Sequence, residues 1–259
     1  MSETPNKKQD KNSRKNVILF ALLLSVICSL LITAAAVGLK GFQMVNMELD
    51  KKINILKAAN LMGNKKLAKK EINTLYDAHI KKVIVDGEGR IIENDAPNSL
   101  ILYFYQQDGI TRGYIIPINT RGLWGKIQGY LAFENDGQTV SGFSIFSHSE
   151  TPGLGGEIES AWFQKNFKGK KILNSQNKFV SIGIAKGKSA NLPKDKQSHY
   201  VDGISGATLT GKYLSKGIEQ TLITYDAVSI IFRQKKLKAV IDVPKKEIYR
   251  KDINPKDTQ

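Results

Sequence analysis

Cysteine and histidine are scarce in this chain of 259 residues, which has one Cys and three His. A single cysteine forms no disulfide within the chain and does not by itself build a Cys-rich metal site. His79, His148 and His199 have no metal-ligand spacing with one another. The sequence also contains no Walker motif, no Gly-x-Gly-x-x-Gly fingerprint and no recognisable Ser-His-Asp set. These absences argue against a metal centre, a dinucleotide site or a hydrolytic triad built by this chain.

Acidic residues are also few, because 24 Asp and Glu face 39 Lys and Arg for a formal net charge of +15. Nucleic-acid proteins can show such a balance, but no nucleic-acid motif is present. We therefore expect no nucleic-acid partner. Attraction to phosphate, to anionic membrane lipid or to an acidic partner subunit fits the charge better.

One long apolar run, residues 17–39, contains no charged residue. It exceeds the roughly 20 residues that a helix needs to cross a bilayer, so we expect a transmembrane helix. The alternative is a cleaved signal peptide, with Ala34-Ala35-Ala36 resembling a cleavage site. Cys28 lies in this run as a small apolar residue, or alternatively contributes to a metal site shared with other subunits. The run has no acid that would mark an ion path.

The flanks of the run predict its orientation. The first sixteen residues are net positive, with Lys7, Lys8, Lys11, Arg14 and Lys15. The positive-inside rule then keeps this tail in the cytoplasm and places the chain after Lys40 outside, in the periplasm if the cell has two membranes. We expect a cytoplasmic tail at 1–16, the membrane helix at 17–39, a helical stalk at 40–82, a folded domain at 83–224 and a basic extension at 225–259.

The outer part reads as strands flanked by helices. Helical spacing covers 44–62, a second helix is expected at about 66–81, and a third at 211–224. Turn signals at Gln106–Gly109 and Asn135–Gly137 predict two hairpins. The expected strands are 83–85, 100–105, 113–118, 125–133, 140–146 and 179–184. This order predicts an α+β fold with a mainly antiparallel sheet.

The segment 202–210 reads Asp-Gly-Ile-Ser-Gly-Ala-Thr-Leu-Thr and leads into the last expected helix. Its small residues allow a backbone to approach a phosphate closely, and free N–H groups before a helix favour an anion. The hydroxyls of Ser205, Thr208 and Thr210 would lie within reach of that phosphate. A threonine here is also a candidate acceptor for a phosphoryl group. The alternative is a Gly-rich turn that caps a helix.

This segment resembles the motif of proteins that carry flavin mononucleotide (FMN) on threonine through the flavin phosphate. In that family an FMN transferase uses FAD as the donor, and the threonine of Ser-Gly-Ala-Thr is modified. The resemblance implies Thr208 as the acceptor. The surrounding recognition pattern is matched by Asp202, Gly203, Ser205, Gly206, Ala207 and Thr210.

Two further segments extend the resemblance. The stretch 122–133 starts with Gly-Leu-Trp-Gly, and the stretch 150–157 reads Glu-Thr-Pro-Gly-Leu-Gly-Gly-Glu. With the threonine motif, they resemble the C subunit of the Na⁺-translocating NADH:quinone oxidoreductase, and the related G subunit of the Rnf ferredoxin:NAD⁺ complex is the alternative. The resemblance covers 17–224. The basic tail 225–259 departs from it, and residues 230–232 are expected to extend the sheet or to dock on a partner.

The resemblance also implies contacts to the flavin ring from the loop 150–156. Leu154 would lie on a ring face, Glu150 or Thr151 would bond to the ring edge, and Gly153 and Gly155 would permit close approach. An ordinary Pro-Gly turn is the alternative for this loop. We expect Trp124 to belong to the core and the three histidines to be surface or satisfied residues, although His148 precedes the loop and could lie near the ring.

Together these features imply a single-pass inner-membrane subunit with a periplasmic flavin domain. It would relay electrons through FMN towards quinone, in contact with membrane lipid and other membrane subunits, while NADH is oxidised elsewhere in the complex. An alternative of a different class is a membrane-anchored, non-redox domain that binds flavin as a sensor or not at all.

Overall fold

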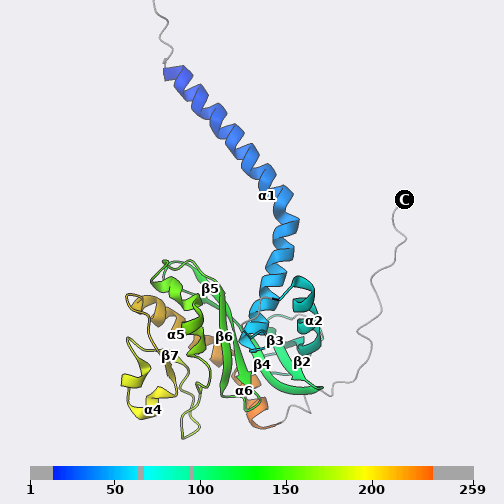
Figure 1. Cartoon of the computed structure of the whole chain (residues 1–259), viewed down its shortest axis with the longest axis vertical. Helices are drawn as coiled ribbons and strands as arrows, with labels where there is room; N and C mark the ends of the chain where they lie inside the picture. Colours follow the sequence, from blue (N-terminus) through cyan, green and yellow to red (C-terminus); the bar gives the residue numbers. More distant parts are fainter. Residues whose placement is uncertain (1–13, 64–66, 94–95, 236–259) are drawn as a thin grey trace, which may run out of the picture. The chain divides into compact units, whose positions relative to one another are not determined.

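The computed structural model describes residues 14–63, 67–93 and 96–235. The chain divides into two compact units, residues 1–48 and residues 49–259. Within the described residues the elements, labelled in Figure 1, are: α1 Arg14–Ala58, α2 Lys69–His79, β1 Ile80–Val85, β2 Ile91–Ile92, β3 Leu100–Gln107, β4 Ile110–Arg121, β5 Lys126–Glu134, β6 Val140–Ser147, η1 Gly155–Glu159, α3 Ala161–Lys165, β7 Gly183–Ile184, η2 Ser189–Asn191, α4 Lys194–Gln197, β8 Tyr200–Val201, α5 Thr208–Thr224 and α6 Asp226–Arg233.

The first unit holds most of α1. This helix is long and apolar enough to span a membrane by length and composition, and its most apolar stretch is exposed. The expected apolar run and the expected stalk helix are one continuous helix in the structure. Only its last turns, which belong to the second unit, bury side chains, including Ile55 and Leu56.

The second unit is built on a six-stranded sheet with strand order β2-β1-β3-β4-β5-β6. All neighbouring strands in this sheet are antiparallel. The predicted α+β fold with a mainly antiparallel sheet is therefore confirmed. Both predicted hairpins are present, and their turns place Gly109 and Gly137 at positive φ, which glycine adopts without a steric penalty.

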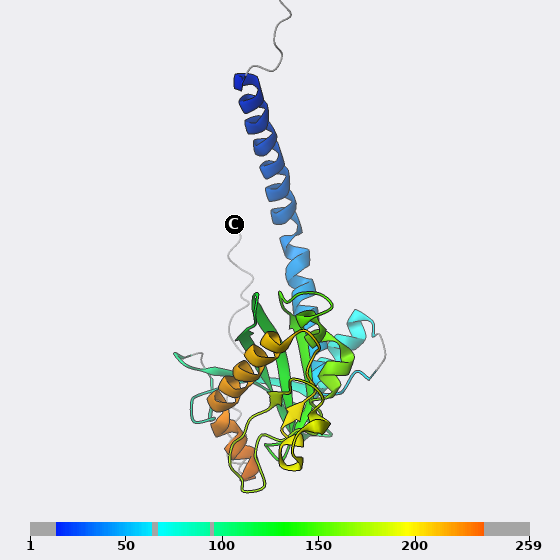
Figure 2. The ribbon, with the colours of Figure 1, turned by 90° about the vertical axis from the view of Figure 1, so that its left-hand side faces the viewer.

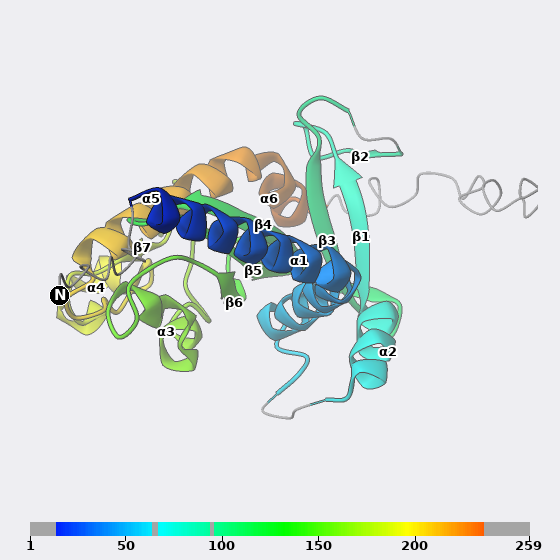
Figure 3. The ribbon, with the colours of Figure 1, turned by 90° about the horizontal axis from the view of Figure 1, so that it is seen from above.

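Alternate side chains of the strands enter two separate cores. Tyr114 and Ile116 of β4 join the larger core with α5 and α6, whereas Ile115 between them joins a smaller core with Ile55 and Leu56 of α1. Figure 3 shows α5 and α6 on one side of the central strands and α2 on the other. Because both faces are covered, consecutive residues in the middle of β4 and β5 are buried, whereas the ends of these strands are exposed.

Helix α5 crosses the sheet on the larger core, as Figure 2 shows. Its Gly217 lies so close to β4 that a Cβ atom there would collide with the side chain of Thr120. Near the helix start, Ser215 Oγ accepts the N–H of Ile184 at 2.9 Å and donates to the carbonyl of Gly211 at 2.8 Å. These contacts fix the N-terminal half of α5 against β4 and β7.

Two expected elements differ in the structure. Only Gly183 and Ile184 of the expected strand 179–184 are in a strand, because Ser181 has a positive φ of 60° that ends the extended run. Residues 230–232 belong to the helix α6 and not to a sheet strand. Val228 and Phe232, four residues apart, enter the larger core from one face of that helix, so the core includes residues beyond Thr224.

Candidate functional site

The turn before α5 presents Thr208 to solvent. Ser205 and Gly206 form the turn, with φ +74° at Gly206, and Thr208 is the first helical residue. Ser205, Gly206 and Thr208 are exposed, and no residue that the structure describes bonds to either hydroxyl. The first bond within the helix runs from the Gly211 N–H to the Ala207 carbonyl, which leaves the N–H groups of the first turn open. An exposed hydroxyl at such a place suits a phosphate ester.

Thr210 lies inside the fold, in contrast to Thr208. Its hydroxyl donates to Glu150 Oε2 at 2.6 Å, and its side chain is 2% exposed. Glu150 Oε1 accepts the backbone N–H of Trp124 at 3.1 Å, and Glu150 is 4% exposed. Through these bonds the two side chains tie three segments together, and their expected contacts to a phosphate and to the ring edge stay predictions.

Glycines let these three segments approach one another around Glu150. A Cβ at Gly122 would collide with the Glu150 carboxylate, one at Gly155 would collide with the Thr210 hydroxyl, and one at Gly206 would lie 2.7 Å from Leu154. The Gly122–Gly125 loop, the Glu150–Gly156 loop and the start of α5 thus form one packed unit. Gly155 thus permits the close approach of protein segments, and its expected approach to the flavin ring stays a prediction.

A cavity of about 340 Å³ opens between these three segments, with Thr208 in its wall. It is lined by Leu123, Trp124, Thr151, Leu154, Gly155, Gly206, Ala207, Thr208, Leu209 and Thr210. Trp124 is 70% exposed, so the expectation that it belongs to the core was wrong. The turn closed by the Gly122 N–H and the Gly125 carbonyl holds its indole outside. Two glycines around a tryptophan were the signal for this turn.

Leu154 and Thr151 both line this cavity, as the ring contacts expected of them require. The carbonyl of Thr151 accepts the N–H groups of Leu154 and Gly156 at 3.2 and 2.9 Å. Gly153 has φ +72° and an open surrounding, so it serves the turn and does not line the cavity. Leu209, which the sequence reasoning did not select, adds a second exposed leucine to the wall.

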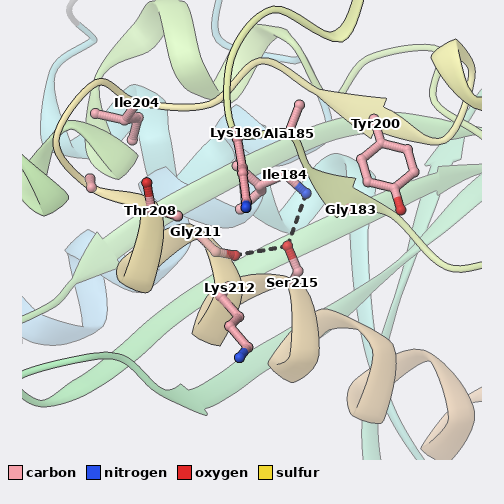
Figure 4. Close-up of a pocket in the computed structure, with 11 residues that line it drawn as sticks. Gly183, Ile184, Ala185, Lys186, Tyr200, Ile204, Thr208, Gly211, Lys212 and Ser215 are labelled. Carbon is pink, nitrogen blue, oxygen red and sulfur yellow. Dashed lines mark hydrogen bonds between the residues drawn. The ribbon is translucent and has the colours of Figure 1, made fainter. Parts of the chain in front are cut away.

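A second cavity of about 290 Å³ lies on the other side of Thr208 (Figure 4). It is lined by Gly183, Ile184, Ala185, Lys186, Tyr200, Ile204, Ala207, Thr208, Gly211, Lys212 and Ser215. In Figure 4 the Lys186 side chain extends towards the first turn of α5, and the Lys212 amine points away from it. The lining has two cationic residues and no carboxylate. Thr208 therefore stands between an apolar cavity and a cationic one.

The Asp202 carboxylate is bonded to another segment of the domain. Its Oδ1 accepts both the side-chain hydroxyl and the backbone N–H of Ser189, each at 2.7 Å. These two bonds hold the pKa of the Asp202 carboxyl below its usual range. The structure shows Asp202 bonded within the protein, and its expected part in cofactor binding stays a prediction. Sequence reasoning missed Ser189, because nothing in its neighbourhood marks it.

The three histidines are each bonded to the protein. Nδ1 of His148 accepts the Glu150 N–H at 3.1 Å, and its Nε2 lies 3.2 Å from Glu159. The ring of His79 bonds to the carbonyl of Gln106, and the ring of His199 bonds to the carbonyl of Lys171. No cluster of His, Cys, Asp or Glu able to hold a metal occurs among the described residues. His148 supports the base of the Glu150–Gly156 loop.

Comparisons with known proteins agree with this site. The family model of the FMN-binding domain matches residues 122–223, which include both loops and the Thr208 turn. The C subunit of the Na⁺-translocating NADH-quinone reductase of Haemophilus ducreyi is 34% identical over 83% of this chain and 90% of that protein. The corresponding protein of Pasteurella multocida is 32% identical over 78% and 87%.

Solved structures show the same likeness. The crystal structure of the same C subunit from Parabacteroides distasonis has a TM-score of 0.64 and 30% identity, covering 74% of this chain and 96% of that one. Shewanella oneidensis NqrC, at 19% identity, supports the fold with a TM-score of 0.59 over 73% and 99%. The chain therefore belongs to the family of the C subunit of the Na⁺-translocating NADH-quinone reductase, an oxidoreductase complex.

Proposed function

We propose that this protein carries FMN as a phosphoester on Thr208 and relays electrons within the complex towards quinone. The observation that carries the proposal is the exposed Thr208 hydroxyl, which makes no bond to any described residue, in the wall of an apolar cavity in an FMN-binding domain. Bound flavin would supply the uptake and release of electrons, and the protein would supply its position and surroundings. Neighbouring iron–sulfur or flavin centres of the complex would be its donor.

The residues around Thr208 fit such a group. The apolar cavity offers an exposed indole from Trp124 and the side chain of Leu154 to the flat faces of the ring. On the opposite side, Lys186 provides positive charge beside a phosphodiester. The open N–H groups at the start of α5 add to this attraction.

In the attachment reaction, the Thr208 hydroxyl forms a bond from Oγ to the flavin-side phosphorus of FAD. The bond between that phosphorus and the bridging oxygen of the pyrophosphate breaks, AMP leaves, and the hydroxyl proton is released. An FMN transferase would catalyse this step. The chain then gains the mass of FMN less one water.

We further propose that α1 anchors the protein in the inner membrane, with the tail 1–16 in the cytoplasm and the flavin domain in the periplasm. The support is the apolar stretch of α1 and the basic residues before it. Membrane lipid and the membrane subunits of the complex would then be its neighbours.

The test is the intact mass of the full chain made with and without an FMN transferase, together with flavin fluorescence of the denatured band. We expect the gain in wild type and in Thr224→Ala, a matched change at an exposed threonine of the same helix. Thr208→Ala should lose the gain completely and keep the fold, since the side chain is exposed. Flavin that remains bound to denatured Thr208→Ala would contradict the assignment.

A further inference from the structure

The residues of the segment 202–210 differ in their exposure to solvent. Ser205, Gly206, Thr208 and Leu209 are exposed. Ile204, Ala207 and Thr210 are buried, and Asp202 is half-buried. An approaching enzyme would therefore meet only part of the motif, and the two polar side chains at its ends are engaged elsewhere.

The first end is held at Asp202. Its side chain makes the two bonds to Ser189, and the backbone that follows is also bonded, because the Gly203 N–H donates to the Gly187 carbonyl at 2.8 Å. Gly203 also lies against the carbonyl of Ala185, where any Cβ would collide. The chain that enters the acceptor turn is thus fastened to the segment 185–189.

The second end is held at Thr210, through its 2.6 Å bond to Glu150. Because this bond lies in the interior, removal of the hydroxyl leaves a buried carboxylate oxygen without that donor. Between the two ends the turn depends on Gly206, whose positive φ other residues rarely adopt.

We propose that Asp202 and Thr210 are positioning residues for flavin transfer: through Ser189 and Glu150 they hold the turn in the shape that presents Thr208 to the transferase. The proposal rests on the proposed function of Thr208. The transferase then recognises a folded turn and contacts Ser205, Gly206, Thr208 and Leu209. The transferase does not contact the Asp202 carboxylate or the Thr210 hydroxyl.

The experiment measures initial rates of FMN transfer from FAD to the full chain in detergent, by intact mass, at several concentrations of the chain. If only a fraction of molecules holds the turn in the competent shape, the KM for the chain rises by the inverse of that fraction and kcat stays the same. A lost contact in the transition state lowers kcat instead. Whether KM or kcat changes therefore separates positioning from direct recognition.

At Asp202, the Asn variant keeps an oxygen that accepts both bonds from Ser189, and the Ala variant removes it. We expect Asp202→Asn to stay within about threefold of wild type in KM, and Asp202→Ala to raise KM about tenfold or more, since the loss of two hydrogen bonds to a charged acceptor corresponds to about that factor. Ser189→Ala should raise KM less. The double variant Asp202→Ala/Ser189→Ala should be no worse than Asp202→Ala, because both act through one contact.

At Thr210, Ser keeps the donor to Glu150 and Val removes it with little change of shape. We expect Thr210→Ser to behave nearly as wild type and Thr210→Val to raise KM about tenfold. Asp136→Ala is the matched control, since Asp136 likewise accepts N–H and hydroxyl bonds from Gln138 and Thr139, in the β5–β6 turn. It should leave the transfer kinetics unchanged.

Thermal unfolding and hydrogen exchange of the Ser189 amide accompany each variant. Faster exchange at Ser189 in Asp202→Ala, with a cooperative unfolding transition, supports local release of the turn. The proposal would be overturned if Asp202→Asn and Asp202→Ala lowered kcat equally while Ser189→Ala behaved as wild type. That result would mean that the transferase contacts the Asp202 carboxylate directly. Absence of mass gain on wild-type Thr208 would instead refute the proposed function itself.

Discussion

At the scale of single residues, a hydroxyl and a carboxylate of the same site have opposite surroundings. The Thr208 hydroxyl is exposed and unbonded among the described residues, whereas Glu150 is buried and accepts two bonds from other segments. Chemistry at the surface and support beneath it are thus carried by different residues. The exposed Trp124 beside them is, like Thr208, a residue of the surface.

Trp124 provides a test of where the ring lies. Because the indole is 70% exposed, Trp124→Leu should change the free energy of unfolding by no more than about 0.5 kcal/mol. If the ring packs on this indole, attachment of FMN should quench most of the Trp124 emission. The measurement is tryptophan fluorescence before and after flavin transfer.

Trp162 is the matched control, since it is 47% exposed, contacts Phe163 edge to face and does not line the cavity. In Trp162→Phe, the remaining Trp124 emission should fall strongly on flavin transfer. In Trp124→Leu, the remaining Trp162 emission should fall less. Equal loss from both residues would place the ring outside the Trp124 cavity.

Sequence reasoning at this scale selected Thr208 and Leu154, which line the cavity, but it did not predict the bonds that their neighbours make within the protein. Small residues and hydroxyls before a helix identify a turn, yet they do not say which side chains point inward. Thr210 and Asp202 are polar and look available in the sequence. Their partners, Glu150 and Ser189, lie 60 and 13 positions away, and only the folded chain brings them together.

At the scale of elements, α5 positions the site because it lies unusually close to β4. Gly217 makes this possible, since its missing side chain leaves room for Thr120. Gly211 plays a milder part, because a Cβ added there would lie 3.1 Å from the Ile184 side chain. The start of the helix, and with it Thr208, is fixed by this packing.

We predict that Gly217→Ala destabilises the domain, although Gly to Ala inside an exposed helix normally stabilises by up to about 1 kcal/mol. The added methyl group would collide with Thr120, and overpacking of this kind costs about 1–3 kcal/mol. Urea unfolding measures the change. Gly211→Ala should have a smaller effect, and an increase in stability for Gly217→Ala would contradict the packing described.

The elements were predicted well where local signals decide them. The two hairpins follow from their turn residues, and β3 to β6 lie close to the strands expected there. Only the end of the strand expected at 179–184 forms, as β7, and β8 was not predicted, because two-residue strands depend on tertiary pairing and not on local pattern. Residues 230–232 suggested a strand, but the spacing of Val228 and Phe232 suits the helix that forms.

At the scale of the whole molecule, the chain joins an exposed apolar helix to a domain with two cores. The orientation proposed for it depends on charges that mostly lie outside the described residues. Its test therefore has to label one residue before the membrane helix and one residue after it, in the protein as it lies in the membrane. Cys28 is the single native thiol, so a Cys28→Ser background leaves no other site for a maleimide.

In that background we expect a membrane-impermeant maleimide to label Ser175→Cys in cells whose outer membrane has been removed. Ser175 is exposed in the flavin domain. Ser2→Cys, in the basic tail, should be labelled only after the inner membrane is opened. The background without added cysteine is the control, and labelling of Ser2→Cys in closed cells would contradict the proposed orientation.

The bond between Thr210 and Glu150 also bears on the order of folding. It joins residues 60 positions apart, whereas the β5–β6 hairpin closes over only a few residues. Contacts between distant residues carry the larger loop-closure entropy and tend to form late. We therefore expect the hairpins to pair before the flavin site closes, so that flavin transfer follows the folding of the domain.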